Sequence, residues 1–293
     1  MTDFGELITA MITPFNENLK INWQSVDKIS DHLIKTGTDS ILVSGTTGES
    51  PTLRDEEKID LVKFLKKKFK DKIKIISGTG SYDTAHSCEL SKKAEQAGAD
   101  GILAVAPYYN KPSQKGLFMH FKMISESIKI PLIIYNVPSR TVSNISSSTC
   151  VNLAQLSNIS AVKEASSDFK QIGEILRDAD KDFKIYSGND GDTFTIVAMG
   201  GYGVISVASH IIGEEIKKMI SYIKNNNIYK AAEIHKNYLD IFYGIFMTSS
   251  PIPIKKAMDL IGLEAGPLRL PLCEMEKSEE TIFKTLLAKH GII

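Results

Sequence analysis

A repeating alternation of short apolar runs and longer amphipathic stretches constrains the fold of this chain more than any other feature. The apolar runs lie at residues 7–13, 40–44, 73–77, 101–106, 131–136, 159–163, 183–187 and 203–207. Segments with helical periodicity follow them at 23–35, 54–68, 84–97, 114–128, 147–156, 169–178, 192–199 and 213–224. Near-continuous apolar strands are typical of a parallel sheet that is buried on both faces. Eight such units predict an α/β fold, a (β/α)8 TIM barrel.

A doubly wound open sheet is the alternative topology. Such a sheet usually carries a glycine-rich dinucleotide turn after an early strand, and Gly78-Thr79-Gly80-Ser81 lacks the third glycine. The remainder of the chain contains no strand pattern and is interpreted as helices at 228–243, 254–261 and 279–289, punctuated by prolines. We therefore expect a barrel over residues 1–224 and a C-terminal helical appendage over residues 225–293.

Charge and composition exclude several classes of protein. Lys+Arg 35 balances Asp+Glu 35, whereas a duplex-DNA binder normally has a basic excess, so we expect no nucleic-acid partner. No apolar run approaches the roughly 20 residues of a membrane helix, and the N-terminal segment has no signal-peptide pattern. The 3 cysteines lie far apart in sequence, which predicts small core residues in a reducing compartment. We therefore expect a cytoplasmic protein without membrane contact.

Lys163 is the most informative residue at the carboxyl ends of the strands, where barrel enzymes place their working groups. It ends the apolar run Ile159-Ser160-Ala161-Val162. An ammonium there points toward the barrel mouth and is partly desolvated, which lowers its pKa. The neutral amine can then attack a ketone or aldehyde and form an imine. The alternative is a solvated Lys163–Glu164 pair that caps the strand, and spacing alone does not separate the two interpretations.

Polar side chains at other strand ends favour a catalytic lysine. Tyr135, Tyr109 and Thr46 carry hydroxyls that could form a proton relay beside it. Arg140 follows on the same loop as Tyr135, and a guanidinium binds a carboxylate through two hydrogen bonds. Tyrosines that fill a loop core and a solvated arginine are the structural alternatives. None of the 6 histidines forms an H-x-x-x-H pair, so we expect no metal site.

Four strand-end segments together form a specific pattern. They are Gly45-Thr46-Thr47-Gly48-Glu49-Ser50, Pro107-Tyr108-Tyr109-Asn110-Lys111-Pro112, Tyr135-Asn136-Val137-Pro138-Ser139-Arg140-Thr141 and Val162-Lys163-Glu164-Ala165. The set resembles the signature segments of the dihydrodipicolinate synthase (4-hydroxy-tetrahydrodipicolinate synthase) family, within the pyruvate-dependent class I aldolases. The resemblance runs from about Gly5 to the C-terminal helices, although Gly-Thr-Thr-Gly-Glu alone also fits sister aldolases.

The resemblance implies a role for each matching residue. Lys163 would form a Schiff base with pyruvate, and Thr46, Tyr109 and Tyr135 would form the proton relay. The tyrosine at position 109 would reach the site of a neighbouring subunit. The substrate-binding residues would be Arg140 for the carboxylate of L-aspartate 4-semialdehyde, and Thr47 with the backbone at Gly188 and Ile205 for pyruvate.

The implied enzyme is a lyase. It would condense pyruvate with L-aspartate 4-semialdehyde, the first committed step of lysine and diaminopimelate biosynthesis. The lysine itself would serve as the electron sink, so the family uses no metal or organic cofactor. A dimer would be the minimal active unit, and a homotetramer built from dimers is usual.

Two other functions compete with this interpretation. The first is another lyase of the same superfamily, an N-acetylneuraminate lyase or a keto-deoxy-sugar aldolase, which would share Lys163 and Tyr135. Arg140 separates the two, because those lyases generally lack an arginine in the Tyr-Asn-x-Pro loop. The second is a barrel that binds a ligand without turnover, for which the four candidate catalytic side chains would have to be coincidental.

Departures from the family pattern concern regulation. In members inhibited by L-lysine, the effector site involves the segments matching 50–58 and 80–86. Those members often carry a histidine, an asparagine and a glutamate where this chain has Lys58, Tyr82 and His86. His86 cannot act as an anionic partner for the ammonium of lysine, so we expect weak or absent feedback inhibition. Ser250 replaces an asparagine that is often seen there, and nothing in the sequence explains it.

Overall fold

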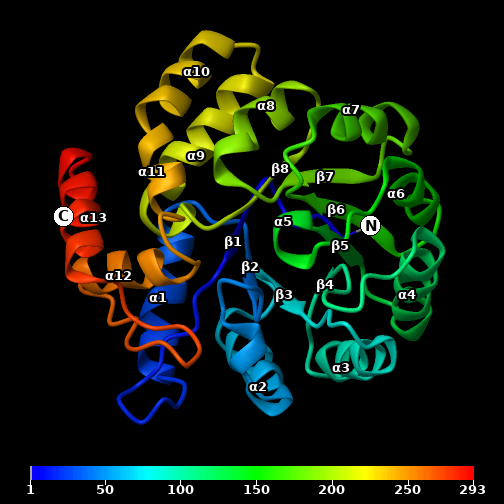
Figure 1. Ribbon diagram of the computed structural model, residues 1–293, viewed down its shortest axis with the longest axis horizontal. Helices are drawn as coiled ribbons and strands as arrows, with labels where there is room; N and C mark the ends of the chain where they lie inside the picture. Colours follow the sequence, from blue (N-terminus) through cyan, green and yellow to red (C-terminus); the bar gives the residue numbers. More distant parts are fainter. Residues whose placement is uncertain (1) are drawn as a thin grey trace.

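Eight parallel strands form a closed barrel in the computed structural model, which describes residues 2–293 (Figure 1). The strands, which pair in sequence order, are β1 Leu7–Ala10, β2 Ser40–Val43, β3 Lys74–Gly78, β4 Gly101–Val105, β5 Leu132–Asn136, β6 Ile159–Glu164, β7 Lys184–Ser187 and β8 Gly203–Ser206. The outer helices are α1 Trp23–Lys35, α2 Asp55–Phe69, α3 Thr84–Gln96, α4 Gln114–Ser127, α6 Ser147–Ala154, α7 Phe169–Asp178, α8 Thr193–Ala198 and α9 Ser209–Lys224. The predicted TIM barrel is confirmed.

The strands are apolar along their whole length because both of their faces are buried. Inward-pointing side chains such as Ile8, Leu42, Leu103 and Ile133 fill the barrel with a compact inner core. The alternate residues of the same strands pack against the helices in a larger outer core. This two-sided burial explains why the sequence carries runs of apolar residues rather than an apolar–polar alternation.

The largest differences from the predicted element boundaries occur at three places. β1 ends at Ala10, because beyond it the Ile12 amide donates to the buried ring of His210 instead of continuing the ladder. α9 begins at Ser209, before the predicted residue 213, and departs from helical geometry at Ile212. The single helix expected over 228–243 is divided into α10 Ile228–Asn237 and α11 Leu239–Gly244.

The C-terminal segment is helical, as predicted, and lies on one side of the barrel next to α1 and α9 (Figure 1). It continues with α12 Ile252–Leu260 and α13 Lys277–Lys289. Within residues 2–293, every helix is too short or too polar to cross a lipid bilayer. The cysteines are free, and Cys150 is buried, but Cys273 is exposed, so the expectation of a core position is wrong for that residue.

Candidate active site

Lys163 lies near the carboxyl end of β6, beside Tyr135 on β5. The strand register pairs Tyr135 with Lys163 and Asn136 with Glu164. Both members of the first pair point into the barrel, and the Lys163 Nζ lies 4.4 Å from the centre of the Tyr135 ring. Only 5% of the surface of Lys163 and 6% of that of Tyr135 are exposed. The amine and the phenol therefore share one desolvated environment at the top of the barrel.

Burial shifts the ionisation of both groups toward their neutral forms. Desolvation lowers the pKa of Lys163 to about 8; the negative charge of Asp190 opposes this shift, and the positive charge of Arg140 supports it. Desolvation raises the pKa of Tyr135 to about 12, while the positive charge of Arg140 and the hydroxyl of Thr46 act in the opposite direction. At neutral pH the phenol is protonated, and a usable fraction of the lysine is a nucleophilic amine.

Glu164 points out of the barrel and belongs to a buried polar network. Asn136 Nδ2 donates to both carboxylate oxygens of Glu164 at 3.1 Å, and the Ser166 amide donates to Oε1 at 2.8 Å. Gln171 on α7 donates to Oε2 at 3.3 Å. Burial raises the pKa of Glu164, and these hydrogen bonds oppose that shift. The interpretation of Lys163 and Glu164 as a solvated surface pair is thus wrong, since the two side chains lie on opposite faces of a buried strand.

The loop after β2 carries Thr46 and Thr47. It is a tight turn in which the Gly48 amide donates to the Gly45 carbonyl at 3.1 Å and the Glu49 amide donates to the Thr46 carbonyl at 3.0 Å. Glu49 has a positive φ of 55°, a conformation that a residue other than glycine adopts only when its surroundings impose it. The hydroxyl of Thr46 is therefore held by loop geometry rather than by a strand.

The loop after β7 passes directly beside the lysine. A Cβ atom on Gly188 would lie 3.2 Å from Lys163 Cε and 2.7 Å from the Cβ of Ala165, so a larger residue would force the loop or the lysine stem to shift. Asp190 is buried two residues later, where it accepts from the Val207 amide at 3.0 Å. Burial raises the pKa of Asp190, whereas its hydrogen bonds and Lys163 oppose the shift.

A cavity of about 370 Å³ brings most of the predicted site together. Its lining includes six of the residues that the sequence singled out: Thr46, Thr47, Tyr135, Arg140, Lys163 and Gly188. The C-terminal segment supplies a wall that the sequence did not predict, formed by Phe242, Tyr243, Phe246 and Ser250. Phe242 and Tyr243 lie in a segment predicted only to be a helix, Phe246 lies beyond that helix, and Ser250 was noted only as a departure from the family pattern, so no sequence signal placed them at the barrel mouth.

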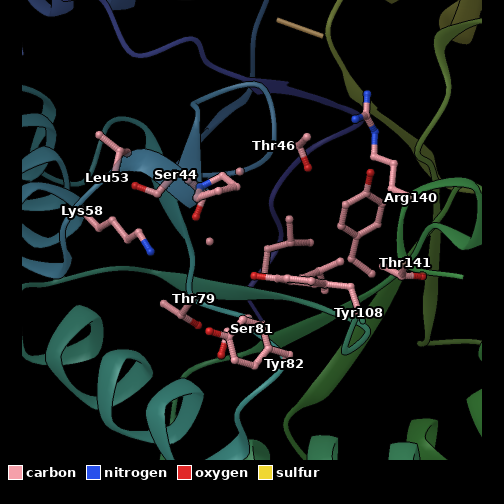
Figure 2. A pocket seen from close by; sticks show the side chains of 18 of the residues that line it. Ser44, Thr46, Leu53, Lys58, Thr79, Ser81, Tyr82, Tyr108, Arg140 and Thr141 are labelled. Atoms are coloured by element: carbon pink, nitrogen blue, oxygen red, sulfur yellow. The ribbon is translucent and has the colours of Figure 1, made fainter. Parts of the chain in front are cut away.

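A second cavity, of about 770 Å³, continues the first outward, since both are lined by Thr46, Tyr135, Val137 and Arg140. Figure 2 shows Arg140 and Lys58 on opposite sides of this larger cavity, with Thr46 near the side of Arg140. Arg140 is exposed on the short helix α5 Pro138–Thr141, and among residues 2–293 it has no ion-pair partner. Its guanidinium is therefore available to an acidic molecule in the cavity.

Two predicted site residues lie apart from this group. Tyr109 is 92% exposed with a φ of 71°, and its phenol lines neither cavity. Ile205 is fully buried in the inner core at β8. Asp190 is an ionisable group near the lysine to which sequence reasoning gave no role, and Glu164 was considered only as the partner of Lys163 in a solvated pair. Nowhere in residues 2–293 do three His, Cys, Asp or Glu side chains gather in a way that could hold a metal ion.

The chain is similar to known proteins over nearly its whole length. Residues 3–290 match the profile of the Dihydrodipicolinate synthetase family. A 4-hydroxy-tetrahydrodipicolinate synthase of Heliobacterium modesticaldum is 46% identical over 290 residues, which is 99% of this chain and 97% of the relative. The crystal structure of a dihydrodipicolinate synthase from Bacillus anthracis superimposes with a TM-score of 0.96 at 42% identity, covering 98% of this chain and 99% of the other. The enzyme from Cyanidioschyzon merolae with lysine bound gives a TM-score of 0.97 at 39% identity, covering 99% of each chain.

Proposed function

The chain belongs to the dihydrodipicolinate synthetase family and is a lyase, and on that premise we propose that its cavity condenses pyruvate with L-aspartate 4-semialdehyde by the 4-hydroxy-tetrahydrodipicolinate synthase reaction. The observation that carries the proposal is the buried amine of Lys163, which lies against Tyr135 and opens onto a cavity that also contains Arg140. The reaction would serve the biosynthesis of lysine and diaminopimelate.

The first half of the reaction uses the neutral amine. Lys163 attacks the keto carbon of pyruvate, water leaves, and an imine forms between Nζ and that carbon. Thr47 and the backbone at Gly188 and Ile205 bind the pyruvate. The imine withdraws electrons from the adjacent methyl group, which then loses a proton to the relay that includes Tyr135 and becomes an enamine.

The second half joins the two substrates. Arg140 binds the carboxylate of L-aspartate 4-semialdehyde, and its exposed position at the outer cavity suits the capture of an anion from solvent. The enamine carbon attacks the aldehyde carbon, and the relay returns a proton to the new alkoxide. The amine of the second substrate then displaces Lys163 from the imine carbon and closes the six-membered ring, which frees the enzyme.

Tyr109 enters this scheme through a neighbouring subunit. Its exposed phenol and strained backbone are supporting observations, because a bulky aromatic side chain at positive φ is uncommon in a free loop. We propose a homo-oligomer, a homotetramer built from dimers, in which the tyrosine of one subunit completes the relay of the other. We also propose a cytoplasmic location, where pyruvate is available and free thiols persist.

Inhibition by L-lysine is proposed to be weak or absent, although a relative was crystallised with lysine bound. The outer cavity contains Lys58, Tyr82 and His86. Asp55 also lines this cavity, but the ring of His86 lies 2.8 Å from its Oδ2 and Lys58 Nζ lies 3.8 Å from its Oδ1. A further ammonium would have to compete with two partners that the chain already supplies. Inhibition at sub-millimolar L-lysine would contradict the proposal.

A substrate comparison tests the function itself. Purified protein is given pyruvate with L-aspartate 4-semialdehyde, and in parallel pyruvate with N-acetylmannosamine, in assays coupled to the consumption of pyruvate. We expect turnover with the semialdehyde and at least about 100-fold lower kcat/KM with the sugar, because only the semialdehyde presents a carboxylate to Arg140. Preference for the sugar would transfer the assignment to the neuraminate lyase branch of the superfamily.

A further inference from the structure

A buried ion pair outside the cavity links the C-terminal segment to the loop that carries Thr46 and Thr47. Lys255 on α12 and Glu49 at the end of that loop approach to 2.9 Å, and their side chains are 2% and 0% exposed. The mechanism above uses neither residue. Burying two charges costs desolvation free energy, and apolar side chains of similar volume often stabilise a fold as well or better. Stability alone is therefore a weak reason for this pair.

The ammonium of Lys255 is fully satisfied where it lies. Besides Glu49, it donates to the Pro267 carbonyl at 2.6 Å and to the Thr13 carbonyl at 3.2 Å. It also lies 4.6 Å from the centre of the Phe15 ring. These contacts come from the loop after β1, the loop after β2 and the C-terminal segment, so one side chain holds three separate parts of the chain at fixed distances.

Glu49 connects Lys255 to the loop that carries Thr46 and Thr47. Its second carboxylate oxygen accepts from the Arg269 amide at 3.0 Å, so neither oxygen can move without losing a partner. Its own amide donates to the Thr46 carbonyl at 3.0 Å. The Gly48 carbonyl accepts from the hydroxyl of Thr13 at 2.8 Å, and Lys255 also holds the carbonyl of that threonine. Lys255 is thereby connected to both ends of the Thr46–Gly48 turn through single residues.

We propose that Lys255 and Glu49 are positioning residues: the C-terminal segment sets the location of the Thr46 and Thr47 side chains at the site. The inference rests on the proposed function, since it assigns these threonines to the pyruvate half of the reaction. A small displacement of a reacting group has a large kinetic cost, of about 100-fold for 1 Å. Neither Lys255 nor Glu49 lines the cavity that contains Lys163, so neither is expected to touch substrate.

The experiment separates positioning from stability by removing both charges together. Lys255→Met alone leaves a buried carboxylate without its partner and is expected to be strongly destabilised. In Glu49→Gln/Lys255→Met, the amide oxygen still accepts from the Arg269 amide and no charge is left unpaired. We expect its thermal unfolding midpoint to stay close to that of the unaltered protein. The KM for pyruvate should rise about tenfold and kcat should fall about tenfold.

The KM for L-aspartate 4-semialdehyde is the internal control, because Arg140 lies on a different loop and should keep it within about twofold. Lys256→Met is the matched variant: the neighbouring lysine of α12 forms an ion pair with Glu280, also at 2.9 Å, on a partly exposed surface. It should leave all kinetic constants unchanged. If the double variant does not fold, Glu49→Asp decides, because it keeps both charges of the pair and only shortens the side chain between Lys255 and the loop. A rise of at least about threefold in the KM for pyruvate is expected.

Borohydride trapping of pyruvate by the unaltered protein is measured first. If no adduct forms, the proposed function fails and the positioning proposal fails with it. If the adduct forms but the folded double variant, or Glu49→Asp in its place, has an unaltered kcat and KM for pyruvate, only the positioning proposal is overturned. An equal rise in the KM values for pyruvate and for L-aspartate 4-semialdehyde would also overturn it, because that pattern indicates general damage to the fold.

Discussion

The β5–β6 edge and the β2 loop bring groups to the same cavity in different ways. Tyr135 and Lys163 are paired residues of two adjacent strands, almost fully buried, and the ladder itself sets their separation. Thr46 lies on a turn that ends in a residue with positive φ, and it is only partly buried. Its location depends on contacts with Thr13 and, through Glu49, with the distant Lys255.

This difference shows that the barrel strands fix the positions of Lys163 and Tyr135 directly, whereas the position of Thr46 depends on contacts from other parts of the chain. Strand pairing is the most reproducible geometry in this fold, and it holds the two groups closest to the bond-forming step. The loop holds groups that bind pyruvate and take part in proton transfer, and its geometry has to be fixed by additional contacts. Substitutions of the strand residues should therefore abolish a chemical step of the reaction, whereas substitutions of the loop residues should only slow it.

The largest effect is expected at the strand edge. Lys163→Ala removes the amine that forms the imine in the proposed scheme, so kcat should fall by about 10⁴-fold or more. The fold should survive, because the substitution removes a buried amine rather than a packed apolar side chain. Steady-state assays with both substrates measure the loss, and circular dichroism confirms that the variant is folded. Full turnover would refute the covalent scheme.

A direct test of the comparison sets Tyr135→Phe against Thr46→Val. The first removes a buried phenol that transfers protons, and we expect kcat to fall by about 10²- to 10³-fold. The second removes a partly buried hydroxyl that acts through Tyr135, and we expect about a tenfold loss. Both changes preserve side-chain shape, so equal unfolding midpoints are the control. A larger effect from the loop residue would reverse the assignment of roles.

Gly188→Ala tests how closely the β7 loop confines the lysine. The new Cβ would lie 3.2 Å from Lys163 Cε and 2.7 Å from the Cβ of Ala165, so the loop or the lysine has to shift. We expect about a 100-fold loss in kcat/KM for pyruvate. Because Arg140 is not displaced, the KM for the semialdehyde should change little. Unaltered pyruvate kinetics would mean that the loop yields without moving the amine.

The smallest effect is the displacement of the pH profile by the charge of Arg140. With the pKa of Lys163 lowered to about 8, the reactive neutral amine is the minor form below that pH and the major form above it. The kcat/KM for pyruvate should therefore rise with pH by about tenfold per unit and level off above pH 8. Removing the positive charge in Arg140→Gln should raise the pKa and move the profile to higher pH. A shift to lower pH would contradict the electrostatic account.

The sequence predicted the barrel from local patterns, and six of the candidate site residues, some named from local patterns and some from the family resemblance, line one cavity. Apolar runs identify buried strands, and Lys163 and Tyr135 stand out as polar residues where such runs end. The Glu49–Lys255 contact could not be predicted, since it joins residues 206 positions apart and nothing in the signature segment that contains Glu49 indicates Lys255 as its partner. The C-terminal wall of the cavity was missed for the same reason: periodicity predicts a helix but not where it docks.

Trapping the imine tests the central claim most directly. The protein is incubated with pyruvate and borohydride, digested, and the modified peptide is identified by mass spectrometry. The account predicts one reduced pyruvate adduct, located on Lys163, together with a parallel loss of activity, and no adduct in Lys163→Ala. An adduct on a different lysine, or unimpaired activity with no adduct, would contradict it.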